Sequence, residues 1–218
     1  TPQDLPANTR QWAQRRDGTQ AAATADGLFE RPAQGAWQRL QVDDGQGRLW
    51  AARDVLGVTY DARDELWFAT RAGVGQRTAA GWRFLEGRDG LPYNDFTCCA
   101  AGADGSVWFG THRGAIRYQD GQWAYRQGLR WLPHDDVRAI AVEPDGTAWL
   151  ATAQGVGCIE RRPMTLADKA EYYEDEISKY IKRTPFGYTA EVSLPRPGER
   201  SQVVQSDSDN DGLWTAMY

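Results

Sequence analysis

The chain has 218 residues, of which 41% are hydrophobic and 25% charged, a balance that excludes an intrinsically disordered protein. Its net charge of −5 arises from acids and bases interspersed along the chain, so no basic stripe favours nucleic acid as a partner. No apolar run approaches the roughly 20 residues that a membrane-spanning helix needs, which argues against membrane insertion. Ten tryptophans and 23 glycines instead indicate many short strands joined by tight turns.

The N-terminal region, residues 8–53, is a degenerate copy of a repeat that becomes clear further along. It follows the link Leu5-Pro6-Ala7-Asn8 and contains the hairpin signal Asp17-Gly18, in which glycine tolerates the positive φ of a tight turn. A second turn is expected at Thr24-Ala25-Asp26-Gly27. Ala21 occupies the position at which the later copies carry tryptophan.

From residue 54 onward, four landmarks recur with a spacing of 41 residues, which defines the copies 54–94, 95–135 and 136–160. A link of the form Leu-Pro-x-Asn/Asp also recurs, at residues 91 and 132. The four landmarks are an opening aspartate, a tryptophan, a threonine and a glycine: Asp54, Asp95 and Asp136; Trp67, Trp108 and Trp149; Thr70, Thr111 and Thr152; Gly73, Gly114 and Gly155.

Each copy reads as four short antiparallel strands. In the clearest copy the expected strands are 95–103, 107–111, 115–118 and 123–126, separated by turn signals. One such meander cannot bury both of its faces, but sheets placed side by side around an axis cover one another. The sequence therefore predicts an all-β fold, a β-propeller of four-stranded antiparallel blades over residues 1–160. The tryptophans expected in its core are Trp67, Trp108 and Trp149, with Trp37, Trp82 and Trp123 from the outer strands.

The pattern Asp-Gly-x-x-Trp-x-x-Thr-x-x-Gly, with its Leu-Pro-x-Asn link, resembles the two-component regulator propeller repeat over about residues 5–160. Such repeats build ligand-sensing or substrate-associated propellers in periplasmic sensor proteins and in some carbohydrate-active enzymes. The resemblance implies a β-propeller in a periplasmic or extracellular setting, often one concerned with glycans. It assigns no catalytic residue.

The repeat ends before the fourth strand of its last copy, and residues 161–183 change period. Leu166, Ala170, Tyr173 and Ile177 recur at steps of three and four, which predicts an amphipathic helix capped by Thr165. Its polar face is acidic and would be repelled by anionic lipid, so we expect it to pack on protein.

The tail, residues 184–218, contains two strand-like runs, 188–194 and 202–205, followed by an apolar stretch that begins a helix. The run 188–194 is one candidate for the outer strand that the last copy lacks. The ending resembles the start of the helical-toroid domains that follow such propellers in carbohydrate-processing proteins. We interpret the tail as the opening of a truncated second domain, and the chain as a fragment.

The candidate ligand site follows from propeller geometry, in which the turn between the second and third strands lies on the same face as the link to the next blade. Arginines there suit carboxylate or sulfate, and aromatic rings suit sugar surfaces, so a glycan or another acidic or polar ligand is expected. In an alternative, catalytic interpretation, His112 or His134 acts as the base and Tyr93 acts as the acid. The residues are Arg71, Tyr93, His112, Arg113, Trp131, His134 and Gln154.

Calcium is the candidate metal ion. Asp207, Asp209 and Asp211 alternate before Gly212, like the first half of a calcium loop. The twelfth loop position is Tyr218 where a bidentate glutamate is expected, so a solvated acidic turn and carboxylates that serve another domain remain as alternatives. No other cofactor is indicated. Cys98, Cys99 and Cys158 form no disulfide framework and are expected to be small buried side chains on strands.

Three functional hypotheses remain. The first is a non-catalytic propeller that binds a ligand as a sensor. The second is the N-terminal part of a polysaccharide-degrading lyase or hydrolase whose catalytic region lies elsewhere. The third is an assembly scaffold that pairs with further blades or a helical domain, in the same protein or in another chain. The sequence contains no P-loop, GxSxG, HExxH or dinucleotide fingerprint, so enzymatic activity is left open and the non-catalytic hypothesis is favoured.

Overall fold

The computed structural model describes residues 4–48, 50, 53–180, 189–196, 199–206 and 208–217. The chain divides into two compact units, Thr1–Arg161 and Arg162–Tyr218, called here the propeller unit and the C-terminal unit. Each is described by itself.

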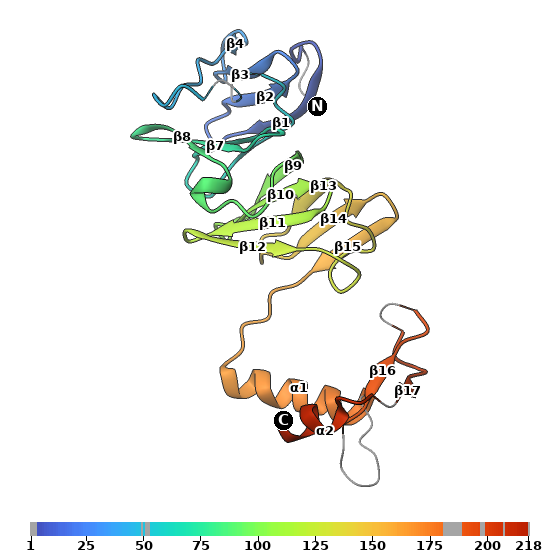
Figure 1. Cartoon of the computed structure of the whole chain (residues 1–218). Coiled ribbons are helices and arrows are strands. Elements are labelled where there is room, and N and C mark those ends of the chain that lie inside the picture. Colours follow the sequence, from blue (N-terminus) through green and yellow to red (C-terminus); the bar gives the residue numbers. More distant parts are fainter. Residues whose placement is uncertain are drawn as a thin grey trace. The chain divides into compact units, whose positions relative to one another are not determined.

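The propeller unit consists of four antiparallel sheets, or blades, whose strands follow one another in chain order (Figure 1). Blade 1 contains β1 (Thr9–Gln14), β2 (Gln20–Thr24), β3 (Gly27–Arg31) and β4 (Gln38–Arg39). Blade 2 contains β5 (Gly57–Tyr60), β6 (Leu66–Ala69), β7 (Val74–Thr78) and β8 (Gly81–Leu85), followed by a 3-10 turn at Gly87–Asp89. Blade 3 contains β9 (Phe96–Ala101), β10 (Val107–Thr111), β11 (Gly114–Gln119) and β12 (Gln122–Arg126). Blade 4 contains β13 (Val137–Val142), β14 (Ala148–Thr152) and β15 (Gly155–Ile159).

The predicted all-β propeller of antiparallel blades is therefore confirmed, and the four blades coincide with the four copies of the repeat. Blade 4 has three strands, and no strand of the described part of the chain pairs with the free edge of β15. The innermost strands β1, β5, β9 and β13 are neighbours in that order. Within the described residues, β1 and β13 do not pack closely together, so the four blades form an arc.

The threonine and glycine landmarks build the turn between the second and third strands of each blade. In blade 3, Thr111 Oγ1 donates to the backbone oxygen of Gly114 at 2.8 Å and accepts from the backbone N–H of Arg113 at 3.0 Å. Gly114 has a φ of +119°, and a Cβ there would lie 2.4 Å from the backbone oxygen of Arg126. The side chain of threonine thus closes a turn whose backbone only glycine adopts without strain.

The opening aspartates of blades 2 and 3 connect each of these blades to the turn of the preceding blade. The backbone N–H of Asp54 donates to the oxygen of Ala25 at 3.0 Å, and that of Asp95 donates to the oxygen of Arg71 at 2.9 Å. Both aspartates have left-handed backbone, with φ values of 51° and 63°, as does the blade 1 counterpart Asn8 at 58°. Aspartate and asparagine tolerate this conformation better than other non-glycine residues, which explains why the repeat uses them here.

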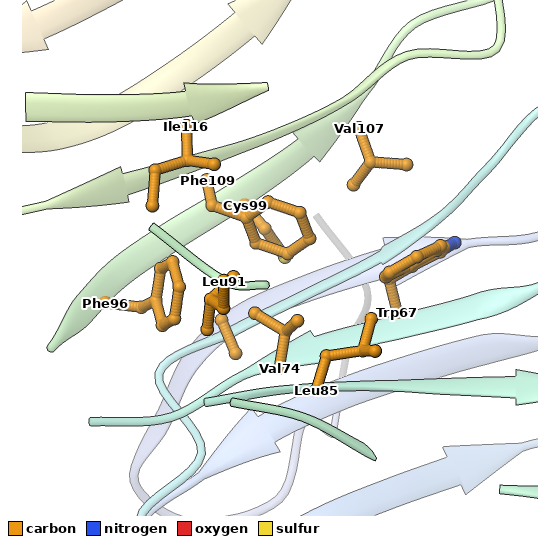
Figure 2. Close-up of a cluster of buried hydrophobic side chains, with 10 residues drawn as sticks. Trp67, Val74, Leu85, Leu91, Phe96, Cys99, Val107, Phe109 and Ile116 are labelled. Carbon is orange, nitrogen blue, oxygen red and sulfur yellow. The ribbon is translucent and has the colours of Figure 1, made fainter. Parts of the chain in front are cut away.

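The core lies between the blades. Figure 2 shows the junction of blades 2 and 3, where buried side chains of both sheets face one another and Trp67 lies at one side of the cluster. Trp67 is 1% exposed, and its ring lies 5.9 Å from that of Phe109 and 5.2 Å from that of Tyr118. Its Nε1–H donates to Asp61 Oδ2 at 2.8 Å. Trp108 is equally buried at the junction of blades 3 and 4, as predicted.

The prediction that every repeat tryptophan is buried was wrong for Trp149, which is 43% exposed. Blade 4 lies at one end of the arc, and within the described residues of the propeller unit no other blade covers the face that carries this residue. Cys158 lies on the same face and is also exposed, contrary to the prediction, whereas Cys98 and Cys99 are buried and burial raises the pKa of both thiols. The outer-strand tryptophans are half-buried rather than fully buried: Trp37, Trp82 and Trp123.

The C-terminal unit contains the predicted helix, α1 (Leu166–Tyr180), the strand pair β16 (Glu191–Ser193) and β17 (Val204–Ser206), and α2 (Asp211–Met217). Thr165 caps α1 as expected: the backbone N–H of Asp168 donates to Thr165 Oγ1 at 3.1 Å, and the N–H of Thr165 donates to Asp168 Oδ2 at 3.0 Å. The run 188–194 does not provide the outer strand of blade 4, because β16 pairs with β17. In the described part of the chain, every helix is too short or too polar to cross a bilayer.

Candidate ligand-binding site

Two of the predicted ligand residues are bound to the opening aspartates. Arg71 Nη1 donates to Asp95 Oδ1 at 2.8 Å, and its Nε lies 3.6 Å from Asp54 Oδ2. His112 Nδ1 lies 2.8 Å from Asp136 Oδ1, and this hydrogen bond lowers the pKa of the Asp136 carboxyl. Arg71 and His112 therefore join successive blades, and the neighbouring carboxylates occupy part of their capacity to bind an acidic ligand.

Tyr93 and Arg113 come together through a residue that the sequence analysis did not single out. The Tyr93 ring stacks on that of Tyr125, with centroids 6.4 Å apart and an interplanar angle of 9°. The Tyr125 hydroxyl donates to the backbone oxygen of Arg113. Burial raises the pKa of Tyr125, and the Asp135 carboxylate raises it further. Within the described residues, the Arg113 guanidinium has no hydrogen-bond or ion-pair partner.

Trp131 lies at the centre of a cationic cluster in the link between blades 3 and 4. Its indole is 36% exposed, with the guanidinium of Arg126 4.6 Å and that of Arg130 5.5 Å from its ring centroid. The loop is fixed from within, because the N–H of Trp131 donates to the oxygen of Gly128 at 2.9 Å. We call Trp131, Arg126 and Arg130 the Trp131 cluster. Arg126 was missed because it belongs to β12, although its place five residues before Trp131 was readable.

His134 and Gln154 lie near this cluster but play different parts. The backbone N–H of Asp136 donates to His134 Nδ1 at 3.0 Å, so that nitrogen accepts and the proton of the neutral ring is on Nε2. Gln154 is exposed in the turn that opens β15, and Gly155 in that turn lies against Pro133. No hydrogen bond connects either predicted histidine to Tyr93 in the described structure, so the acid–base pair stays a prediction.

A cavity that the sequence analysis missed lies between blades 2 and 3, at the end of the strands opposite to the Trp131 cluster. Its volume is about 540 Å³, and the edges of Trp67 and Tyr118 line it together with carboxylates and two guanidiniums, those of Arg63 and Arg83. Asp61 in this cavity already accepts from the Trp67 indole and from two backbone N–H groups. The lining comes from many separate segments of two blades, and no local sequence signal connects them.

The calcium hypothesis remains a prediction. Asp207 lies outside the described residues. Asp211 Oδ2 accepts from the backbone N–H of Ser208 at 2.9 Å, an arrangement that caps α2. In the described ranges, no three His, Cys, Asp or Glu side chains are close enough together to hold a metal ion.

No protein-family model matches the chain, and no curated protein matches its sequence. Its fold is similar to that of several solved structures. The extracellular domain of a protein assigned to the hybrid two-component systems of B. thetaiotaomicron has a TM-score of 0.57 and 20% identity, over 69% of this chain and 21% of that one. PorZ, a surface component of the type-IX secretion system of Porphyromonas gingivalis, has a TM-score of 0.54 and 15% identity, over 91% of this chain and 28% of that one.

A third similar structure is virginiamycin B lyase from Staphylococcus aureus, with a TM-score of 0.53 and 16% identity, over 77% of this chain and 60% of that one. The chain spans about a fifth of the length of the extracellular domain from B. thetaiotaomicron. At these identities the likeness is one of fold. The chain is thus an arc of β-propeller blades, with a fold similar to those of an extracellular two-component-system domain, a secretion-system component and a lyase.

Proposed function

We propose that the chain is a ligand-binding module that recognises an anionic glycan, or another acidic polar ligand, on one face of blades 3 and 4. This face, called here the loop face, carries the turns between the second and third strands and the links between blades. The observation that carries this proposal is the Trp131 cluster, in which a 36% exposed indole lies against two guanidiniums. An aromatic face stacks on the apolar face of a sugar ring, and a guanidinium binds carboxylate or sulfate through two parallel hydrogen bonds. Together these groups favour a uronate or a sulfated sugar.

The cluster is preorganised, which supports a binding role. The Gly128 N–H donates to Asp135 Oδ1 at 2.6 Å, and Leu132, directly after Trp131, is 1% exposed and belongs to the core between blades 3 and 4. A loop anchored at both ends loses little conformational freedom when it binds a ligand, so less of the interaction energy is spent on ordering. Arg113, without a described acidic partner, adds a further cation on this face.

We infer that the module acts as a sensor or recruiting domain outside the cytoplasm. The inference is supported by the similar fold of the extracellular domain from B. thetaiotaomicron, together with the repeat pattern of the sequence. Fractionation of the native host tests it: recovery of the protein from the periplasm or the medium supports the inference, and retention with cytoplasmic markers contradicts it.

Calorimetric titration tests the ligand. An oligogalacturonate, which carries a carboxylate on each ring, is compared with a neutral malto-oligosaccharide of equal length. We expect the full chain to bind the acidic sugar, and Arg130→Ala and Trp131→Ala each to weaken binding about tenfold, which corresponds to about 1.4 kcal/mol. Because the contacts are ionic and exposed, added salt should weaken binding further.

Arg63→Ala is the matched control, because Arg63 is an exposed arginine at the opposite end of the strands. It should leave the affinity unchanged. The proposal is contradicted if oligogalacturonate and a sulfated oligosaccharide both fail to bind, or if Arg63→Ala weakens binding as much as Arg130→Ala does.

A further inference from the structure

One face of blade 4 is apolar and is covered by no other described part of the propeller unit, and we call it the trailing face of blade 4. It carries Trp149, which is 43% exposed, and Val156, which is 63% exposed. The residues one repeat earlier, Trp108 and Ala115, are 1% and 0% exposed because blade 4 covers them. The trailing face also includes the exposed Ala139, Ala141 and Cys158.

Trp149 is held in the manner of a core residue. Its Nε1–H donates to Glu143 Oε1 at 2.7 Å, as Trp67 Nε1–H donates to Asp61 Oδ2 at 2.8 Å one blade junction away. Glu143 and Asp61 occupy the same position, two repeats apart. The indole of Trp149 is therefore oriented like the buried indole of Trp67, without a blade to cover it.

The structure shows what kind of surface covers such a tryptophan. At the junction of blades 2 and 3, Trp67 packs against the face of blade 3 that carries Cys99, Phe109 and Ile116. These three residues stand opposite one another on β9, β10 and β11. The surface that covers a repeat tryptophan is thus the leading face of the following blade.

Blade 1 has a leading face of the same kind, and none of the other three blades, as far as their residues are described, packs against it. Trp12, Ala22 and Phe29 stand opposite one another on β1, β2 and β3, at the register positions of Cys99, Phe109 and Ile116. Ala22 is 0% exposed, as its counterpart Phe109 is, but Trp12 and Phe29 are only half-buried, whereas their counterparts Cys99 and Ile116 are 1% and 0% exposed. The two ends of the arc therefore carry the two halves of a blade junction.

The charges of the two faces are complementary at one position. Arg31 of blade 1 occupies the position of Tyr118, whose ring covers Trp67 in blade 3. On blade 4, the pKa of Cys158 is raised by burial and then by nearby carboxylates, the largest contribution coming from Glu160. An arginine of blade 1 would thus approach an acidic rim around Trp149 and Cys158.

We propose that the trailing face of blade 4 docks the leading face of blade 1 of a second copy of this chain. Copies then join head to tail, and each Trp149 is buried as Trp67 is. Such a heterologous contact forms a closed ring when its rotation closes and a longer assembly when it does not. A second copy is favoured over other occupants because its leading face has the matching register, apolar residues and charge.

Light scattering coupled to gel filtration tests the assembly with the full chain over a range of concentrations. The proposal predicts a species of at least twice the 24.4 kDa mass of one chain. Val156→Arg should convert it to monomer, because it places a charge in the apolar contact, at the repeat position that Val74 occupies in the core between blades 2 and 3. Leu129→Arg is the matched control, since Leu129 is 64% exposed but lies outside both faces, and it should leave the assembly intact. A monomeric wild type at every concentration overturns the proposal, as does an assembly that survives Val156→Arg.

A cross-link tests the direction of docking. In the repeat, Cys158 is equivalent to Gln76 and Gln20 is equivalent to Val107. Gln76 and Val107 line the same cavity between blades 2 and 3, so residues 158 and 20 should be close in the proposed contact. In Gln20→Cys, mild oxidation should join the new thiol to Cys158 of another copy, giving a reducible dimer or longer species on a denaturing gel. Gln20→Cys combined with Cys158→Ser should give none. A cross-link that persists in the double variant shows that blade 1 meets blade 1, and a lack of any cross-link shows that the faces stay apart; both results overturn the proposal.

Discussion

Replacement of a repeat tryptophan by alanine should lower the free energy of unfolding in proportion to how much of its side chain the next blade buries. Trp67 is 1% exposed, so Trp67→Ala removes a side chain that buries about 150–250 Å². At about 25 cal/mol per Å² this amounts to roughly 4–6 kcal/mol, close to the roughly 3–5 kcal/mol typical of truncating a large core aromatic. Trp149, at 43% exposure, keeps little more than half of that contact within one chain. Trp149→Ala should therefore lower the free energy of unfolding by roughly 2–3 kcal/mol.

The two variants are compared by urea unfolding, followed by circular dichroism, at protein concentrations low enough for the wild type to be a monomer. The expected order is a large loss of stability for Trp67→Ala and about half that loss for Trp149→Ala. An equal loss for both variants would refute the reasoning, because it would mean that a part of the same chain covers Trp149.

Three further predictions follow from single contacts. Asp61→Ala leaves the indole N–H of the buried Trp67 without its acceptor and should lower the free energy of unfolding by about 1–3 kcal/mol. Glu143→Ala removes the acceptor of the exposed Trp149 indole and should lower it by less. Urea midpoints that fall equally in the two variants would contradict this. Gly75→Ala should fail to fold or melt far below the wild type, because its Cβ would lie 2.2 Å from an aromatic ring, while Gly87→Ala, with open space around it, should melt normally. Burial raises the pKa of Glu30, but hydrogen bonds from an arginine and a tyrosine outweigh it and leave that pKa below the usual 4.5. Wild type should therefore exceed Glu30→Gln in stability above about pH 5 and lose that advantage as the pH falls through the lowered pKa, and a gap independent of pH would contradict this.

The fold was predictable because each landmark of the repeat does a local job. The threonine closes a turn around a glycine, the aspartate takes a left-handed backbone where blades 2 and 3 open, and the tryptophan fills the space between sheets. Trp149 shows the limit of this reasoning, because its local sequence matches that of Trp67 although their burial differs. Burial depends on whether a following blade is present, and a repeat pattern cannot report that for its last copy.

The candidate site was only partly predictable. Propeller topology placed Trp131 and Arg113 on one face, but it did not reveal that Arg71 and His112 pair with opening aspartates across a blade junction. Those pairs join residues 24 positions apart, so only the three-dimensional packing of neighbouring blades identifies them. The cavity between blades 2 and 3 escaped prediction for the same reason, since its lining is gathered from several turns of two sheets.

The most direct test of the proposed binding face observes the indole N–H signals of the tryptophans by nuclear magnetic resonance during titration with oligogalacturonate. Trp131 lies on the loop face, Trp67 borders the cavity at the other end of the strands, and Trp108 is enclosed between blades. Binding at the Trp131 cluster should shift the Trp131 signal and leave the other two in place. A shift of the Trp67 signal alone, or unchanged spectra at saturating sugar, would contradict the account.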